Sequence, residues 1–210
     1  MLQERVPENV VFTKEKKEKI KLQKYKYYEE YSEEEIKEKD ATNILANDKY
    51  TLVLNNKGEG YSKYKSVLLN RYKIAQKQGN IIYVTNKANG EIWTTTLEPY
   101  IKEPDEYRVT FSPAKCEFFR IDSGIETKTK IIVSPEDSVE IRQVEIKNTT
   151  ENDVNVVISN FIDPVLCAKD ADIVSPAFNK LFLNARNLFI SFVSSFSKLA
   201  FATFMAFHPS

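Results

Sequence analysis

The chain has 210 residues, and its 30 Lys and Arg residues balance its 30 Asp and Glu residues. A formal net charge of zero excludes a bulk electrostatic grip on nucleic acid or on an anionic membrane. With 42% apolar and 12% aromatic residues, the chain can bury a sizeable core, and its length favours one large domain with extensions. The two cysteines and a start without an apolar leader predict a reducing, cytoplasmic location.

The first forty residues differ from the rest of the chain because charged side chains dominate them and large apolar residues are few. Lysines concentrate between Lys14 and Lys26, and acids concentrate between Tyr27 and Asp40. This order opposes the macrodipole of an isolated helix. We therefore predict residues 1–40 to be a charged linker, partly helical only when docked. The alternative is a basic arm that contacts a partner surface.

The middle of the chain, from about residue 47 to 162, consists of short β-branched and aromatic runs separated by turn residues. Runs of this kind, with no long amphipathic helix between them, predict an all-β fold of two antiparallel sheets. The clearest local feature is a hairpin between residues 81–85 and 91–96. The intervening Asn89-Gly90 pair is typical of a type I′ turn.

One later run breaks the expected alternation of apolar residues. Val139 and Ile141 share one parity, whereas Val144 and Ile146 share the other. A regular strand would send half of these side chains to solvent, so the pattern predicts a β-bulge near residues 142–143.

Residues for nucleophilic or metal chemistry are scarce. The only histidine is His208, which excludes a Ser-His-Asp triad or a histidine-rich metal site within the folded region. Cys116 lies in a strand-like run and is expected to be a buried apolar residue. The Gly58-Glu-Gly60 segment lacks the Gly-Lys-Ser/Thr that completes a phosphate loop, so we interpret it as a turn. We expect no metal and no cofactor.

Flat side chains with polar edges gather near the predicted turns. Aromatic faces that cover a sugar ring, with Arg or Asn bonding its hydroxyls, would form a carbohydrate-binding surface. The alternative role of each aromatic residue is packing within the core. The aromatic residues concerned are Tyr61, Tyr64, Tyr72, Tyr83, Trp93 and Tyr100.

Several ordered sequence blocks resemble the start of the family ninety-four glycoside phosphorylases and the related domain of cyclic β-1,2-glucan synthases. The main block is residues 58–72, a Gly-rich turn followed by Tyr61-Ser62 and ending in Arg71-Tyr72, with Asn70 in place of the family's Thr. The opening segment, residues 2–7, is similar to the one that leads into this domain in the synthases. Further blocks lie at residues 82–84, 90–94, 98–100, 104–107, 134–137, 142–144 and 176–182.

The resemblance implies an N-terminal β-supersandwich that packs against an (α/α)₆ barrel. In that family the barrel carries the general acid and the phosphate-contacting groups, and the blocks found here do not include it. The expected domain is therefore an incomplete supersandwich over residues 41–182, with no catalytic residues of its own. Its implied partners are a β-glucan or oligosaccharide and the barrel of the parent enzyme, which could also be a homodimer and membrane-associated; no nucleic acid is expected.

The resemblance also nominates residues that would face either the sugar or the barrel. Arg71 has an alternative role as a structural strap between sheet and linker. Glu59 and Ser62 are expected to give polar support. The nominated substrate-binding residues are Tyr61, Tyr64, Arg71 and Trp93.

The final 28 residues, 183–210, contain two charged residues and are rich in Phe. Because the resemblance stops at Phe182, we interpret this divergent apolar tail as non-native sequence from a disrupted reading frame. The alternatives are a membrane helix over Leu188–Phe207 and a buried or surface-adsorbed helix. The main functional hypothesis is a non-catalytic carbohydrate-binding or scaffolding fragment of a β-glucan-processing enzyme. The alternatives are a stand-alone β-glucan-binding module and a membrane-tethered protein.

Overall fold

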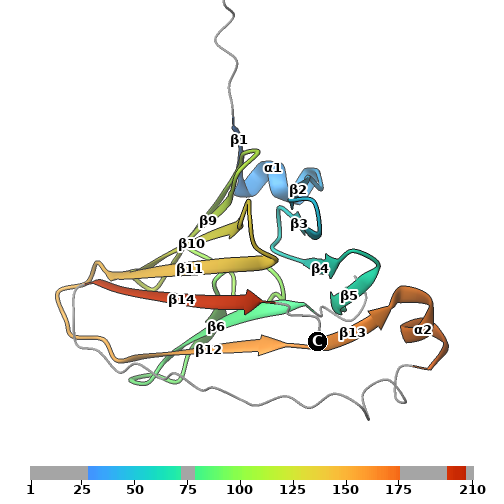
Figure 1. Cartoon of the computed structure of the whole chain (residues 1–210). Coiled ribbons are helices and arrows are strands. Elements are labelled where there is room, and N and C mark those ends of the chain that lie inside the picture. Colours follow the sequence, from blue (N-terminus) through green and yellow to red (C-terminus); the bar gives the residue numbers. More distant parts are fainter. Residues whose placement is uncertain (1–27, 72–78, 176–197, 207–210) are drawn as a thin grey trace, which may run out of the picture.

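The computed structural model describes residues 28–71 and 79–175 and the backbone of the strand over 198–206 (Figure 1). These residues form antiparallel strands with two short helices, so the all-β prediction is confirmed. The strands belong to three sheets rather than two, with six, five and three members.

The six-stranded sheet forms one layer of the molecule, with the order β1-β8-β9-β10-β11-β14. Successive strands pair antiparallel and without a register break. Short turns join β8 to β11 as a meander, as Figure 1 shows. The strands are β1 (Glu29–Ser32), β8 (Glu106–Phe111), β9 (Cys116–Asp122), β10 (Ile125–Val133), β11 (Val139–Asn148) and β14 (Lys198–Ala206).

The two smaller sheets share the other layer. The five-stranded sheet has the order β13-β5-β4-β3-β2, and the three-stranded sheet has the order β12-β6-β7. Strand β12 runs into β13 with only Asp163 between them, so one stretch of chain borders both sheets (Figure 1). The strands are β2 (Thr42–Ala46), β3 (Tyr50–Asn55), β4 (Gly60–Tyr64), β5 (Val67–Asn70), β6 (Asn80–Asn86), β7 (Ile92–Thr94), β12 (Val156–Ile162) and β13 (Pro164–Ala168).

The core consists of two clusters on one face of the six-stranded sheet. The first lies under the five-stranded sheet and includes Leu52 and Phe118. The second lies under the three-stranded sheet and includes Val84 and Val144. Phe118 and Val144 both flank Thr129 in the strand register, which places the two clusters on the same face. The protein is therefore a two-layer supersandwich whose second layer is split.

The domain begins earlier than the predicted boundary at residue 41. Strand β1 pairs with β8, and helix α1 (Glu33–Glu38) follows it directly. Ser32 and Glu35 form a capping box at the start of α1, and the Ile36 side chain is fully buried in the first core cluster. Residues 29–38 are thus part of the sandwich and not of the linker, because one apolar side chain anchors an otherwise charged turn. Residues 1–27 lie outside the described residues.

The predicted β-bulge is absent from the described pairing of β10 and β11, which is continuous from Val133 opposite Glu140 to Ile125 opposite Asn148. The inward face of β11 carries Glu140, Arg142, Val144 and Ile146 in strict alternation. The bulge prediction was wrong because it assumed that all four apolar side chains face the core, whereas Glu140 and Arg142 occupy the first two inward positions and Val139 and Ile141 lie on the other face.

The predicted hairpin is confirmed, but its turn is not of type I′. Thr85 on β6 pairs with Ile92 on β7. The loop spans residues 87–90, and Gly90 has a positive φ of 76° whereas Asn89 does not. Side-chain oxygens stabilise this longer turn: Asn86 Oδ1 accepts from the backbone N–H of Ala88 at 2.9 Å, and Asn89 Oδ1 accepts from that of Glu91 at 3.0 Å.

The tail contributes a strand rather than the continuous helix that was the alternative prediction. β14 pairs with β11 along all of its residues, from Lys198 opposite Lys147 to Ala206 opposite Val139. A membrane helix over Leu188–Phe207 is therefore contradicted in its second half, and residues 188–197 lie outside the described residues. Among the described residues, no helix is long and apolar enough to span a bilayer. The reading-frame hypothesis stays a prediction.

Candidate functional site

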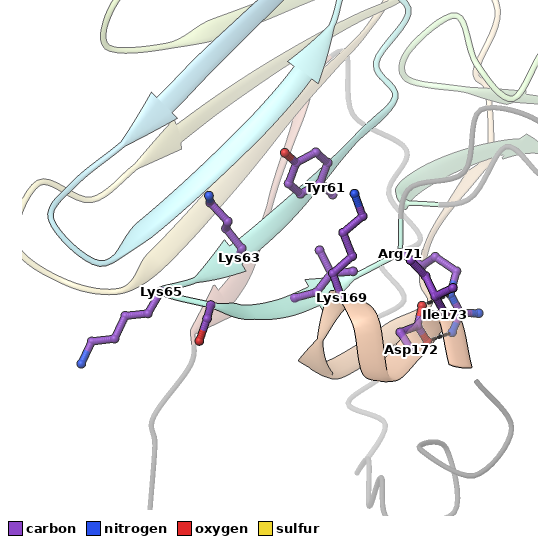
Figure 2. Close-up of a pocket in the computed structure, with 9 residues that line it drawn as sticks. Tyr61, Lys63, Lys65, Arg71, Lys169, Asp172 and Ile173 are labelled. Atoms are coloured by element: carbon purple, nitrogen blue, oxygen red, sulfur yellow. Dashed lines mark hydrogen bonds and ion pairs between the residues drawn. The ribbon is translucent and has the colours of Figure 1, made fainter. Parts of the chain in front are cut away.

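A cleft of about 480 Å³ opens beside β4, β5 and the short helix α2 (Lys169–Val174). We call it the Tyr61 cleft. Tyr61, Leu68 and Ile173 line it with apolar surface, and its lining surface is mostly apolar. Figure 2 shows the Tyr61 ring between the Lys63 and Lys169 side chains, whereas Lys65 points away. The cleft thus combines an apolar lining with ammonium groups at its rim.

Arg71 closes the other end of the Tyr61 cleft, where it is 7% exposed. Its Nε donates to Asp172 Oδ2 at 2.8 Å and its Nη2 donates to Asp172 Oδ1 (Figure 2). Its Nη1 donates to Asp163 Oδ2 at 3.4 Å. The hydrogen bond with Asp172 raises the pKa of Arg71 above its ordinary value, so the charge is permanent. The bidentate pairing with Asp172 occupies the guanidinium. Arg71 directly follows β5, so it straps α2 to the end of β5 and, through Asp163, to the junction of β12 and β13.

Trp93 lies elsewhere, in the second core cluster, with 0% of its surface exposed. The Lys102 ammonium lies 5.7 Å from the centre of its ring. A fully buried indole cannot stack on a sugar or contact a barrel. The prediction that Trp93 is a substrate-binding residue is therefore corrected: it is a core residue.

The two nominated tyrosines of β4 differ in their surroundings. Tyr64 is half-buried and packs against the first core cluster, and the Lys65 ammonium lies 5.5 Å from its ring centre. Tyr61 is half-buried and lines the cleft. Of the four nominated residues, the structure therefore brings only Tyr61 and Arg71 to one surface.

Between these two tyrosines in sequence, Ser62 points the other way and joins a buried polar hub. Ser62 Oγ donates to Glu140 Oε2 at 2.5 Å, and Tyr50 Oη donates to the same oxygen at 3.1 Å. Arg142 Nε donates to Glu140 Oε1 at 2.5 Å, and Arg142 Nη1 donates to the backbone oxygen of Asn80 at 2.8 Å. Burial raises the pKa of Tyr50, so its hydroxyl remains a donor. The hub joins all three sheets.

Glu59 supports the turn between β3 and β4. Its Oε2 accepts from Asn55 Nδ2 at 3.0 Å, and its backbone N–H donates to Asn55 Oδ1 at 2.8 Å. Gly60 follows it, and a Cβ at this glycine would lie 1.9 Å from the backbone oxygen of Val53. The Gly-Glu-Gly motif is therefore a tight structural turn, as expected from the missing phosphate-loop residues.

A third buried ion pair was missed by sequence reasoning. Arg120 Nε donates to Asp122 Oδ2 at 2.6 Å, and both side chains are fully buried. Arg120 also donates to the backbone oxygens of Thr96 at 2.6 Å and Lys102 at 2.8 Å. Burial raises the pKa of Asp122, although Arg120 opposes that rise. The alternation of residues along β9 could have indicated this pair, because Arg120 and Asp122 lie on the opposite face of the strand from Phe119 and Ile121.

Cys116 is fully buried in the first core cluster, as expected. Burial raises the pKa of its thiol to about 11, which makes it a poor nucleophile. Within residues 28–71 and 79–175, no group of three or more His, Cys, Asp or Glu side chains is arranged to hold a metal.

Comparisons with known proteins place this fold. The family model described as "Glycosyl hydrolase 94, supersandwich domain" matches residues 26–189. The cyclic beta-(1,2)-glucan synthase NdvB of Rhizobium meliloti (strain 1021) is 30% identical over 155 residues, which cover 72% of this chain and 5% of that protein. The N,N'-diacetylchitobiose phosphorylases of Vibrio proteolyticus and Vibrio furnissii are each 25% identical over 134 residues, 58% of this chain and 16% of theirs.

The chain thus spans a small part of the relatives that it matches. The family match starts within the expected linker and extends beyond residue 182, the expected end of the domain. Its start at residue 26 agrees with the inclusion of β1 and α1 in the sandwich. On this match and this architecture, the chain belongs to the glycosyl hydrolase 94 supersandwich family.

Proposed function

We propose that this chain is the non-catalytic scaffolding domain of a β-glucan-processing glycosyltransferase or phosphorylase. In the parent enzyme it would brace the catalytic (α/α)₆ barrel. Membership of the supersandwich family and the names of the relatives support the parent class. The buried polar hub carries the scaffolding role, because Glu140 and Arg142 lock three sheets together instead of opening toward a ligand.

A scaffold fits the described residues better than a sugar-binding module. A carbohydrate platform needs several aromatic faces with polar groups around them. Trp93 is buried, Tyr64 packs against the core and Arg71 is held by two carboxylates. Tyr61 is left as the one nominated aromatic residue at the cleft, which is a small surface for a sugar ring.

The surface beside the Tyr61 cleft supports contact with another protein surface. Helix α2 exposes Ile173 by 65% and Val174 by 83%, and Leu166 on β13 is exposed by 45%. Exposed apolar side chains that gather on one surface are typical of interaction sites, and Ile173 and Val174 are neighbours on α2. We assign this surface to the barrel or its linker. The half-exposed free thiol of Cys167 and the buried thiol of Cys116 fit a cytoplasmic location for the domain.

Calorimetric titration of the full 210-residue chain tests this proposal. The chain is titrated with β-1,2-gluco-oligosaccharides and, separately, with the purified catalytic region of the Rhizobium meliloti synthase. The scaffold predicts saturable binding of the catalytic region and none of the oligosaccharides. Saturable oligosaccharide binding that Tyr61→Ala abolishes would instead establish a stand-alone binding module. Light scattering of the same chain, without ligand or partner, shows whether it forms the homodimer that the resemblance allows.

A further inference from the structure

The lysines around the Tyr61 cleft differ from most others in the described part of the chain. Elsewhere, lysines on both layers form ion pairs, such as Lys57 with Asp40 at 2.7 Å and Lys102 with Glu91 at 3.1 Å. Within residues 28–71 and 79–175, Lys63 and Lys169 form no ion pair with a described carboxylate. Both side chains nevertheless converge on one cleft.

The acid that lines the same cleft does not neutralise them. Asp172 is bound through both of its oxygens by Arg71, and its side chain is 7% exposed. Its negative charge is therefore balanced locally by the guanidinium. Because the whole chain has a net charge of zero, two unbalanced ammonium groups beside one cleft constitute a local positive site rather than part of a general basic surface.

The cleft also has an apolar component, which an inorganic anion would leave uncovered. Leu68 and Ile173 line it together with the Tyr61 ring, and the apolar surface continues along α2 to Val174. A partner that fills the cleft must therefore present apolar side chains inward and carboxylates to the rim. An acidic polypeptide segment with apolar anchors has this chemistry.

We infer that the Tyr61 cleft docks an acidic segment with an apolar anchor, supplied by the catalytic part of the parent enzyme. This inference rests on the proposed scaffolding role and names the chemistry of the partner. Lys63 and Lys169 bind its carboxylates, and Leu68 and Ile173 contact its anchor. Arg71 takes no direct part, because it holds α2 in the position that forms one wall.

Fluorescence anisotropy with the full chain tests the inference. The probe is a fluorescein-labelled synthetic peptide in which Glu and Leu alternate, and the comparison peptide carries Lys at every Glu position. The Glu peptide is expected to bind, to weaken steeply as salt is raised, and to lose about tenfold in affinity in Lys63→Glu/Lys169→Glu. The comparison peptide is expected not to bind.

A matched control reverses two exposed lysines that also lack a described ion pair. Lys39→Glu/Lys87→Glu has the same net charge as the cleft variant. It is expected to bind the Glu peptide with the affinity of the unsubstituted chain. Three results would overturn the inference: an equal loss of affinity in both variants, no binding of the Glu peptide by the unsubstituted chain, or full binding by the cleft variant. Circular dichroism of each variant confirms that the sandwich is folded.

The catalytic region of the synthase separates this inference from the proposed function. If that region binds the unsubstituted chain and the cleft variant equally, the proposed scaffolding role stands and the barrel docks at another surface. If it binds neither while the Glu peptide still binds at the cleft, the scaffolding role fails and the chemistry of the cleft stands. Displacement of the peptide by a neutral β-1,2-gluco-oligosaccharide would overturn the polypeptide assignment in favour of a sugar.

Discussion

Ser62 on β4 donates its hydroxyl to Glu140 on β11 across 2.5 Å, and this bond joins the two layers of the sandwich. Ser62 is fully buried and Glu140 is 1% exposed. A buried carboxylate is tolerated only where its charge is paired and its oxygens accept hydrogen bonds. Arg142 supplies the pairing, and Tyr50 supplies the remaining bond.

Replacing Glu140 with Gln is expected to lower the free energy of unfolding by about 3–5 kcal/mol, because Arg142 is left buried without a compensating charge. Urea unfolding of the full chain measures the change. Glu136→Gln removes an exposed carboxylate from the same region and is expected to cost less than about 0.5 kcal/mol.

The double variant Glu140→Leu/Arg142→Met tests the same ion pair by removing both charges together. Removing both charges is expected to be less destabilising than Glu140→Gln alone, because no buried charge remains unpaired. A double variant that is less stable than the single variant would contradict this account of the hub.

Asp172→Asn is expected to loosen helix α2, because Arg71 loses the bidentate carboxylate that straps the helix to β5. Losing a charged buried hydrogen bond costs about 1–3 kcal/mol, which corresponds to roughly tenfold to hundredfold faster exchange of the α2 amides. Hydrogen exchange followed by mass spectrometry reads out residues 169–174. Asp170→Asn, on an exposed position of the same helix, is the control, and equal effects would refute the strap.

Gly60→Ala is expected to destabilise the domain by about 3 kcal/mol. The added Cβ would lie 1.9 Å from the backbone oxygen of Val53, and strand pairing between β3 and β4 prevents either backbone from moving away. Gly90→Ala is the matched comparison, because its Cβ would meet nothing within 4 Å. Its cost is about 1 kcal/mol, for the positive φ of 76°. Thermal unfolding of both variants should show this order.

Trp93 is the chain's single tryptophan, so its fluorescence reports on one site. Because its side chain is fully buried, iodide is expected to quench the emission only after unfolding. β-1,2-gluco-oligosaccharides are expected to leave the emission spectrum of the folded chain unchanged. Efficient iodide quenching under native conditions would show that Trp93 lies at the surface.

The domain is expected to lose stability in alkaline solution. Burial raises the pKa of Cys116 from 9.0 to about 11 and also raises the pKa of Tyr107. A raised pKa in the folded state means that the folded chain holds protons that the unfolded chain releases. The stabilisation is therefore complete below pH 9 and is lost as the pH rises from 9 through about 11.

Urea unfolding at intervals from pH 8 to pH 11 measures this loss. Cys116 alone is expected to contribute roughly 2–3 kcal/mol, since each pKa unit corresponds to about 1.4 kcal/mol. Cys116→Ala should reduce the decline by that amount, and an unchanged decline would show that other groups cause it.

Local chemistry was sufficient to predict many of the strands. The runs at residues 81–85 and 91–96, which became β6 and β7, were read from β-branched content and turn residues. The hairpin at Asn89-Gly90 was also correct in its existence. Its turn type was not, because Asn86 and Asn89 stabilise a longer loop through their side chains.

Prediction of burial from the pattern of apolar and charged residues failed where charged residues lie beside or within the core. Parity suggested a bulge in β11 because all four apolar residues of the run were expected to face the core, whereas Glu140 and Arg142 take inward positions and form the hub between the sheets. Ile36 appeared to belong to a linker because its neighbours are charged, yet it anchors α1 in the core. Burial of an ion pair depends on partners that are distant in sequence, such as Ser62 and Tyr50.

The candidate site shows the same division. Residue types and the family resemblance drew attention to Tyr61, Arg71 and Trp93, but only the fold separates a residue at a cleft from a strap and from a core indole. Alternation and turn residues, being properties of neighbours along the chain, determined the β class and most strand positions. Contacts between residues about a hundred positions apart, such as Arg71 with Asp172, decided which side chains are exposed, because burial is set by packing across the two layers.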